Sequence, residues 1–281
     1  MPAGLQCGSR WLDLSQPVIM GVLNVTPDSF SDGGRFLSLD TALRQAELML
    51  REGAAILDIG AESTRPGAPP VSPAEELDRL LPVLEAIATR LDVIISVDTS
   101  CPDVMTAAAA GGAGLINDVR ALERPGAMAA AVASGLPVCL MHRQGEPPDM
   151  QVAPCYRDVV TEVREWLECR VSACEAAGLA ADRLLTDPGF GFGKTIAHNL
   201  ELLARLREVR VGGVPLLVGM SRKSMLGAVL QGAPVDQRLY AGVAAAALAV
   251  ERGASIIRTH DVRATRDAVA VAAALLSWEK K

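Results

Sequence analysis

The chain has 281 residues, of which 50% are hydrophobic and only 3% aromatic, so a large core is possible but must be mostly aliphatic. This length is long for an ordinary domain and suits one α/β barrel, which takes about 250 residues. A formal net charge of −6 argues against a nucleic-acid-binding protein, because that function needs a positively charged face.

No membrane partner is expected either. The N-terminus lacks a basic stretch followed by an apolar one, which predicts no signal peptide, and the most apolar run, 241–250, is too short to span a bilayer. The six cysteines include no C-x-x-C pair, which predicts reduced thiols in a cytoplasmic protein rather than a disulfide framework or a zinc site.

Short apolar runs alternate with helical stretches eight times along the chain. The runs are too apolar for half-exposed strands, so we expect strands buried on both faces. They cover 18–25, 55–61, 93–99, 114–119, 137–142, 184–190, 215–221 and 255–261. Eight strand–helix units without a linker predict a TIM-type (β/α)₈ barrel, one domain over 1–281 with its core at about 18–275. A doubly wound open sheet is the alternative.

Local signals predict several element ends. Residues 5–14 are expected to form a short hairpin that closes the bottom of the barrel. Ser72 is expected to cap a helix, with Glu75 completing a capping box. Asp40 is expected to start an earlier helix, and Ser100 to cap a later one.

The glycine-rich segment 187–195, DPGFGFGKT, resembles a phosphate-binding loop at first sight. The P-loop pattern requires glycine where this chain has Pro188, and the spacing G-x-G-x-G also fails the dinucleotide fingerprint. We therefore expect the glycines to let the backbone approach a different ligand closely, and Lys194 to be a solvated residue.

Nearly every predicted strand ends in polar residues that core packing does not require. In a barrel these ends meet at one mouth, where α/β barrels carry their active sites. One such acid would be explained as a turn former, but eight ends together predict a ligand site. Acids and asparagine on strands three, four and six, with basic groups on strands seven and eight, predict a ligand with a donor-rich heterocycle and a phosphate-like group. The strand-end residues are Asn24, 62–65, Asp98, Asn117, Asp118, His142, Asp187, 221–223 and 258–261.

Seven segments together closely resemble the dihydropteroate synthase family. They are NVTPDSFSDGG (24–34), ESTRPGA (62–68), SVDTS (96–100), IND (116–118), DPGFGFGK (187–194), GMSRKSMLG (219–227) and RTHDV (258–262). The resemblance covers almost the whole chain. It implies a pterin-binding (β/α)₈ barrel, often dimeric through helices of the outer ring, that acts in folate biosynthesis.

The implied reaction joins 6-hydroxymethyl-7,8-dihydropterin diphosphate to 4-aminobenzoate. It gives 7,8-dihydropteroate and diphosphate, uses Mg²⁺, and follows an S_N1-like route in which the protein stabilises the leaving group and positions the substrates. No residue needs to act as a nucleophile, and the aromatic amine needs no general base. Sulfonamides would occupy the aminobenzoate pocket.

The resemblance assigns three groups of binding residues. The flat pterin edge presents adjacent N–H donors, which a carboxylate accepts in pairs. The implied pterin contacts are Asp98, Asn117, Met141, Asp187, Phe192 and Lys223. The implied aminobenzoate contacts are Phe30, Thr64, Pro66, Phe192 and Ser224.

The implied diphosphate contacts are Asn24, Thr64, Arg65, Arg258 and His260. Arg258 and His260 are two positions apart, so both side chains are expected to face the mouth. Asn24 is the expected protein ligand of Mg²⁺, which otherwise takes phosphate oxygens and waters. The residues expected to carry catalysis are Asn24, Asp98, Asp187, Lys223, Arg258 and His260.

Two departures and two alternatives accompany this resemblance. Ala61 stands where the family often has glycine, and Arg143 where it often has methionine, either as an extra cation near the mouth or pointing into solvent. A methyltetrahydrofolate–corrinoid methyltransferase would have no use for the aminobenzoate loops 26–34 and 63–68 or for a diphosphate clamp. A non-catalytic pterin-binding paralogue should have lost such residues.

Overall fold

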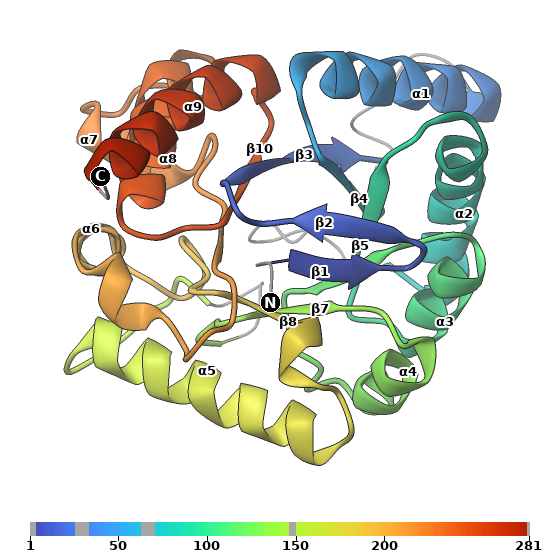
Figure 1. Cartoon of the computed structure of the whole chain (residues 1–281), viewed down its shortest axis with the longest axis horizontal. Helices are drawn as coiled ribbons and strands as arrows, with labels where there is room; N and C mark the ends of the chain where they lie inside the picture. The colour runs from blue at the N-terminus through green and yellow to red at the C-terminus, as the bar shows by residue number, and fades with distance from the viewer. Residues whose placement is uncertain (1–3, 26–33, 63–70, 146–149, 280–281) are drawn as a thin grey trace.

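The computed structural model describes residues 4–25, 34–62, 71–145 and 150–279. Its centre is a parallel eight-stranded sheet in the order β8-β7-β6-β5-β4-β3-β10-β9, with helices around it (Figure 1). The strands are β3 (Val18–Asn24), β4 (Ile56–Gly60), β5 (Ile94–Asp98), β6 (Leu115–Asp118), β7 (Val138–Met141), β8 (Leu184–Asp187), β9 (Leu217–Val218) and β10 (Ile256–Thr259).

The two outer strands of this order meet, which closes the sheet into a barrel. A parallel bridge joins Thr186 of β8 to Leu216, and the Thr186 N–H donates to the Pro215 carbonyl at 3.0 Å. The predicted barrel is therefore confirmed over the open sheet. The strand expected at 215–221 is reduced to two residues, because the chain turns where the Lys223 N–H donates to the Met220 carbonyl at 3.2 Å.

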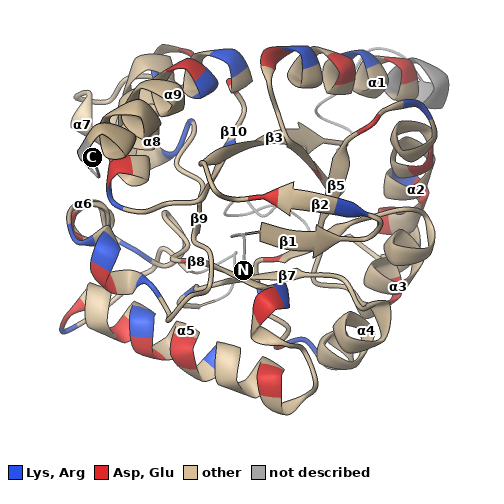
Figure 2. Ribbon diagram, viewed as in Figure 1, with Lys and Arg blue, Asp and Glu red and all other residues tan. Residues whose placement is uncertain are grey.

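Nine α-helices and three 3₁₀ helices are present in the described part of the chain. Charged residues are spread along α1, α2 and α5, whereas α4 carries none (Figure 2). The helices are α1 (Gly34–Glu52), α2 (Pro73–Arg90), α3 (Pro102–Ala110), α4 (Ala127–Ser134), α5 (Val159–Ala176), α6 (Ile196–Ala204), α7 (Ser224–Val229), α8 (Leu239–Glu251), α9 (Val262–Glu279), η2 (Ala181–Arg183), η3 (Leu206–Val209) and η4 (Val235–Gln237).

The helix starts confirm one sequence prediction, the Ser72 cap, and correct three others. Ser72 caps α2 by accepting the Glu75 N–H at 3.3 Å, but the Glu75 carboxylate pairs with Arg79, so only half of the expected capping box forms. α1 begins at Gly34 rather than at Asp40, since no proline between them stops the helix.

Ser100 was expected to cap the helix that follows β5, and this prediction is wrong. α3 begins one residue later than that cap would place it, at Pro102, with Cys101 at the N-cap position. Proline suits the first helical position because its missing N–H is not needed there. The Ser100 hydroxyl instead donates to the buried carboxylate of Asp118, so it ties β5 to β6.

The inside of the barrel is apolar at the amino ends of its strands. A short hairpin, β1 (Gly4–Cys7) paired with β2 (Arg10–Asp13), lies across this end (Figure 1) and confirms the expected closure. The hairpin and the strands share one buried cluster, which removes this end of the barrel from water. Its members are Leu5, Cys7, Leu12, Leu14, Met20, Ile56, Ile94, Leu115, Cys139, Leu185, Leu217 and Ile256.

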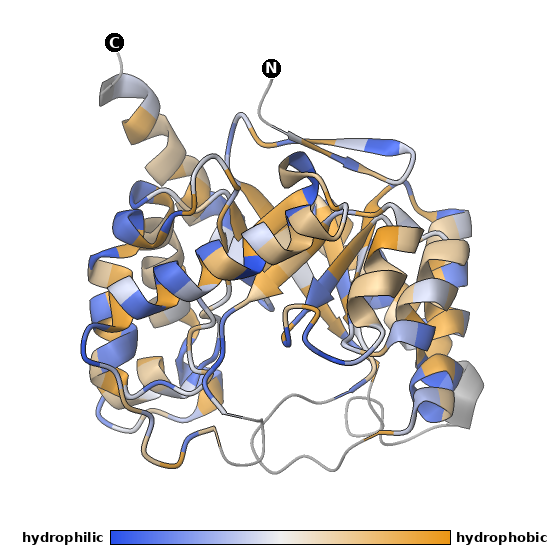
Figure 3. Ribbon diagram, turned by 90° about the horizontal axis from the view of Figure 1, so that it is seen from below, coloured by the Kyte–Doolittle hydropathy of each residue, from blue (hydrophilic) through white to orange (hydrophobic). Residues whose placement is uncertain are grey.

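A second and larger apolar cluster fills the space between the strands and the helices. Figure 3 shows hydrophobic strands in the centre and more hydrophilic residues on the outer surfaces. This arrangement explains why the strands are apolar on both faces at their amino ends. All six cysteines are free, as expected, and no helix among the described residues is long and apolar enough to cross a membrane.

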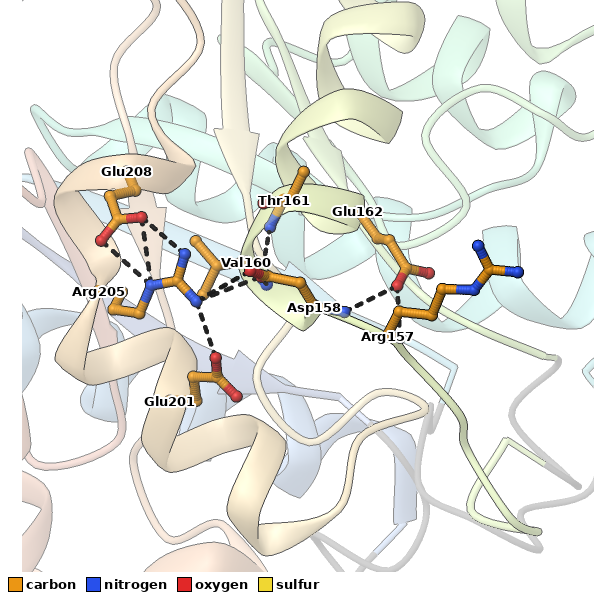
Figure 4. A network of polar contacts seen from close by, with 8 residues as sticks. All are labelled: Arg157, Asp158, Val160, Thr161, Glu162, Glu201, Arg205 and Glu208. Carbon is orange, nitrogen blue, oxygen red and sulfur yellow. Dashed lines mark hydrogen bonds and ion pairs between the residues drawn. The ribbon is translucent and has the colours of Figure 1, made fainter.

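Polar contacts fasten α6 to the start of α5 on the outside of the barrel (Figure 4). Asp158 caps α5 by accepting the Thr161 N–H at 3.0 Å. Arg205, which follows α6, pairs with Asp158 at 3.2 Å, Glu201 at 2.8 Å and Glu208 at 2.8 Å. These groups are partly exposed, so the network joins α6 to α5 with only a modest gain in stability.

The hairpin is expected to contribute strongly to stability. Leu12→Ala should lower the free energy of unfolding by about 2–5 kcal/mol, because Leu12 is 3% exposed inside the apolar end of the barrel. Urea denaturation followed by circular dichroism measures this loss. Leu200→Ala, at a leucine that is 43% exposed, is the matched control and should change stability by about 0.5 kcal/mol or less. Equal effects of the two substitutions would contradict a sealing role for the hairpin.

Candidate active site

Above the apolar cluster, the barrel interior becomes polar. The parallel register aligns Asn24, Gly60, Asp98 and Asn117 across four neighbouring strands. Asp58, Asp187 and Arg258 come from β4, β8 and β10. Because the carboxyl ends of all these strands meet at one mouth, residues far apart in the sequence form one site there.

Arg258 is the cation inside this polar layer. Its Nε donates to Asp58 Oδ2 at 2.6 Å, and a terminal nitrogen donates to Asp98 Oδ2 at 2.9 Å. The Arg258 side chain is 22% exposed and that of Asp58 is fully buried. These bonds use two of the five N–H donors of a guanidinium group. Arg258 is thus held by two strands of the barrel as well as carried by a third.

Asp58 was not among the residues predicted for the site. It also accepts from the Ser96 hydroxyl at 2.6 Å and from the Asn117 amide at 3.1 Å. Because the Asn117 amide nitrogen donates to Asp58, the orientation of the amide group is fixed. Its oxygen then points away from Asp58 and is the atom that can accept a hydrogen bond from a ligand. The available signal was an acid inside the apolar run 55–61, since a buried carboxylate is almost always paired.

Asp98 lies at the upper edge of the polar layer, with a side chain 12% exposed. Burial raises its pKa to about 7; Arg258 opposes the shift and the nearby Asp58 adds to it. Burial outweighs the attraction of the guanidinium, and the negative charge of Asp58 makes ionisation of Asp98 less favourable still. Asp98 therefore changes charge near neutral pH.

Asp187 and Lys223 face each other across the point where the barrel closes. Asp187 Oδ1 accepts the Gly189 N–H at 2.7 Å, and burial raises the pKa of Asp187 while Lys223 opposes that shift. Burial lowers the pKa of Lys223 to about 8, against the effect of Asp187. The Lys223 ammonium donates to the Phe190 carbonyl and lies 4.8 Å from the centre of the Phe192 ring. Asp187, Lys223 and Phe192 thus place a hydrogen-bond acceptor, a hydrogen-bond donor and an aromatic face close together.

The side chains of Asn24 and Asp98 lie on either side of Gly60 at the mouth. A Cβ atom placed on Gly60 would lie 3.8 Å from Asn24 Oδ1 and 3.8 Å from Asp98 Oδ2, so glycine leaves room between them. No group of three or more His, Cys, Asp or Glu side chains suited to a metal was found within the described residues. One amide oxygen fits Mg²⁺ only where phosphate oxygens and waters supply the other ligands.

His260 lies just beyond β10 and contacts Ser221, which follows β9. His260 Nδ1 is 3.1 Å from the Ser221 hydroxyl, which also accepts the His260 backbone N–H at 3.2 Å. Next to this contact, Arg222 pairs with Asp261 at 2.6 Å. The ends of β9 and β10 are thus joined, which brings the predicted His260 beside the predicted segment 221–223.

Other predicted residues fall at varied places. Met141 and Asn117 are buried, Phe192 is half-buried, and Ser224 is the exposed first residue of α7. The aminobenzoate and diphosphate predictions at the loops after β3 and β4 lie outside the described residues, namely Phe30, Thr64, Arg65 and Pro66.

Two further predictions are settled by the structure. Lys194 is not solvated: it is only 3% exposed, because its ammonium lies among carbonyl groups of its own loop. Arg143 turns away from solvent, with a side chain 10% exposed and 3.6 Å from Glu123.

Comparison with known proteins gives a consistent result. Residues 20–260 match the family model described as pterin binding enzyme. The dihydropteroate synthase of Escherichia coli K12 is 56% identical over 266 residues, which cover 95% of this chain and 94% of that protein.

Two solved structures are also similar over nearly their whole length. A Yersinia pestis dihydropteroate synthase in a sulfonamide drug complex superposes with a TM-score of 0.93 at 54% identity, covering 98% of this chain and 99% of that one. A Xanthomonas albilineans dihydropteroate synthase with 4-aminobenzoic acid has a TM-score of 0.93 at 48% identity, with the same coverage.

Removal of the Asp58 charge should destabilise the barrel. In Asp58→Asn, Arg258 loses one of its two carboxylates inside the barrel, so the free energy of unfolding should fall by about 3 kcal/mol. Urea denaturation measures the change. Asp261→Asn, which removes the acid of the more exposed Arg222 pair, is the control and should cost about 1 kcal/mol or less. A loss no larger than that control would contradict the central role of Asp58.

The stability of the parent protein should depend on pH through Asp98. Between the ordinary pKa of 3.8 and the folded pKa of about 7, the folded chain binds more protons at this group than the unfolded chain. The Asp98 contribution therefore stabilises at low pH and is lost as pH rises through that window, by at most about 1.4 kcal/mol per pH unit. Asp98→Asn should lack this slope in unfolding measured from pH 4 to 8. An unchanged slope would assign the titration to another group.

Proposed function

The chain belongs to the dihydropteroate synthase family of pterin-binding enzymes, and from this membership we propose how its own residues carry out the reaction. The substrates are 6-hydroxymethyl-7,8-dihydropterin diphosphate and 4-aminobenzoate, and the products are 7,8-dihydropteroate and diphosphate. The observation that carries the proposal is the joint position of Asp98, Asn117, Asp187 and Lys223 at the mouth, on strands and turns that the barrel brings together.

The pterin ring binds within the polar layer. Asp187 accepts N–H groups of the 2-amino-4-oxo edge, and its Gly189 bond holds the carboxylate in place for them. A charged acceptor discriminates well here, because an unmade bond to a buried carboxylate is costly. Asp98 and Asn117 contact the rest of the ring, while Lys223 donates to a ring oxygen or nitrogen. Met141 and Phe192 provide apolar contact.

The diphosphate binds at the outer ends of β3 and β10. His260 and Arg258 supply donors and positive charge there, supported by Thr64 and Arg65. Asn24 would hold Mg²⁺ together with phosphate oxygens, and the ion, when bound, offsets the charge of the leaving group. Because Arg258 is paired with Asp58 and Asp98, its guanidinium is already oriented before the diphosphate binds. Binding then requires no rearrangement of this side chain.

The bond change needs no protein nucleophile. The methylene C–O bond breaks, diphosphate leaves, and the electron-rich dihydropterin stabilises the cation that remains. The aromatic amine then forms the new C–N bond and loses a proton. The aminobenzoate lies against Phe192, Ser224, Phe30, Thr64 and Pro66, and the protein contributes chiefly by positioning the two substrates and stabilising the departing charge.

The chain's partners and setting are also proposed. A homodimer through the outer helices is supported by large exposed apolar side chains on α8 and α9, and α8 bears no charge before Glu251 (Figure 2). The exposed residues there are Tyr240, Leu248, Val271, Leu275 and Trp278. Six free thiols support a cytoplasmic setting.

The two alternatives are weaker. A methyltetrahydrofolate–corrinoid methyltransferase shares pterin-binding acids but needs no aminobenzoate site, whereas the similar Xanthomonas albilineans synthase was solved with 4-aminobenzoic acid. A non-catalytic paralogue has no need for Lys223 and His260 at the mouth, and this chain has both. As a whole, the chain is 56% identical to the Escherichia coli synthase.

An activity measurement tests the proposal directly. Purified protein with the dihydropterin diphosphate and Mg²⁺ should release diphosphate in step with dihydropteroate formation when 4-aminobenzoate is added. A sulfonamide should inhibit competitively against 4-aminobenzoate, as the sulfonamide complex of the Yersinia pestis protein supports. Tight pterin binding without turnover would move the assignment to an alternative, and a methyl-transfer assay would separate those two.

A further inference from the structure

Lys194 carries a buried amino group next to the pterin residues. Its Nζ lies 2.9 Å from His142 Nδ1, 3.0 Å from the Gly189 carbonyl oxygen and 3.0 Å from the Phe192 carbonyl oxygen. An ammonium has three N–H donors, and these three acceptors match them. A lysine that is 3% exposed needs such partners, since burying its charge without them is very costly.

His142 is able to serve as one of these acceptors. Burial, with Lys194 adding to it, lowers the pKa of His142 to about 2, so the imidazole is neutral. Burial also lowers the pKa of Lys194, while the Asp187 carboxylate opposes that shift. Two carbonyl oxygens that can only accept, together with a neutral ring nitrogen, favour the ammonium form at this position.

The loop around Lys194 packs backbone against backbone. Gly189 has φ +69° and Gly193 φ +60°, both in the left-handed region. A Cβ on Gly189 would lie 1.8 Å from the His142 carbonyl oxygen, and one on Gly193 would lie 2.2 Å from that of Gln144. The glycines therefore bring segment 187–194 directly onto the chain that follows β7, and the Lys194 side chain fills the inside of the loop.

The carbonyls that Lys194 binds belong to residues that build the ligand site. The Gly189 N–H donates to Asp187 Oδ1 at 2.7 Å, so a fixed Gly189 fixes the carboxylate. Phe192 carries the ring that lies under the Lys223 ammonium. On the far side of the loop, the Asn199 amide oxygen accepts the Gly191 N–H at 2.7 Å. The loop is thus held from two sides, and its shape sets the positions of Asp187 and Phe192.

We propose that Lys194 is a positioning residue for pterin recognition: its buried ammonium gathers the carbonyls of the 187–194 loop and so holds Asp187 and Phe192 in place for the ring. The inference rests on the proposed function for the identity of the ligand. Lys194 itself does not contact the pterin. Its effect on binding is therefore transmitted through Asp187, and removing Asp187 should remove much of that effect.

A double-mutant cycle tests this route. Lys194→Met keeps the length of the side chain and removes all its N–H donors. Titration calorimetry with 6-hydroxymethylpterin should show an affinity at least tenfold weaker than that of the parent. In the Asp187→Asn background, the same Lys194→Met change should weaken binding less than threefold. Where Lys194→Met does not fold, Lys194→Gln, which keeps two donors, should give a smaller loss that likewise shrinks in the Asp187→Asn background.

A matched control separates positioning from general stability. Arg205→Met removes a cation from the outside of the same helical segment, and it should alter thermal stability without changing pterin affinity. Unchanged affinity in Lys194→Met or Lys194→Gln, or equal fold losses in both backgrounds, would overturn the positioning role while leaving the proposed function intact. Failure of the parent protein to bind the pterin would overturn both. Asp187→Asn with parental affinity would overturn the route through Asp187.

Discussion

Burying the Arg258 guanidinium inside a barrel constrains everything around it. Such a charge is tolerated only with partners, and the chain provides two carboxylates from β4 and β5. Asp58, fully buried, in turn needs the Ser96 hydroxyl and the Asn117 amide. Each bond fixes the orientation of a further side chain, so the polar groups that three strands contribute to the candidate site are oriented without a ligand. Preorganisation of this kind places the cost of ordering in folding rather than in binding.

The two ends of the barrel interior differ in composition: one is apolar and contributes to stability, and the other carries the ionisable groups. The end covered by the hairpin is lined by aliphatic side chains and by buried thiols such as Cys7, whose pKa burial raises to about 12. The opposite end holds ionisable groups that cost stability when buried. The apolar end and the outer layer of packing offset that cost. The mouth can therefore hold Asp98 with a pKa of about 7 and Lys223 with a pKa of about 8.

Much of the fold and part of the site could be predicted from the sequence. Eight apolar runs gave the barrel, and polar strand ends located Asp98, Asn117 and Asp187, because parallel strands share one carboxyl edge. Asp58 was missed because it lies within an apolar run, and its meaning depends on a partner 200 residues away. Lys194 was expected to be solvated because exposure is usual for lysine, and only the folded glycine loop shows the carbonyls that bury it.

The short strand β9 has a consequence for how the barrel moves. Where β8 meets this part of the chain, the sheet is joined by a single bridge at Thr186 and Leu216. Amide hydrogen exchange through local opening should therefore be fastest between β8 and the segment at Leu216, because the barrel has the fewest strand-to-strand pairs there. Asp187 and Lys223 stand on opposite sides of the line where these two segments meet. A flat ring that formed hydrogen bonds with both side chains would link the two sides of this line and slow the local opening.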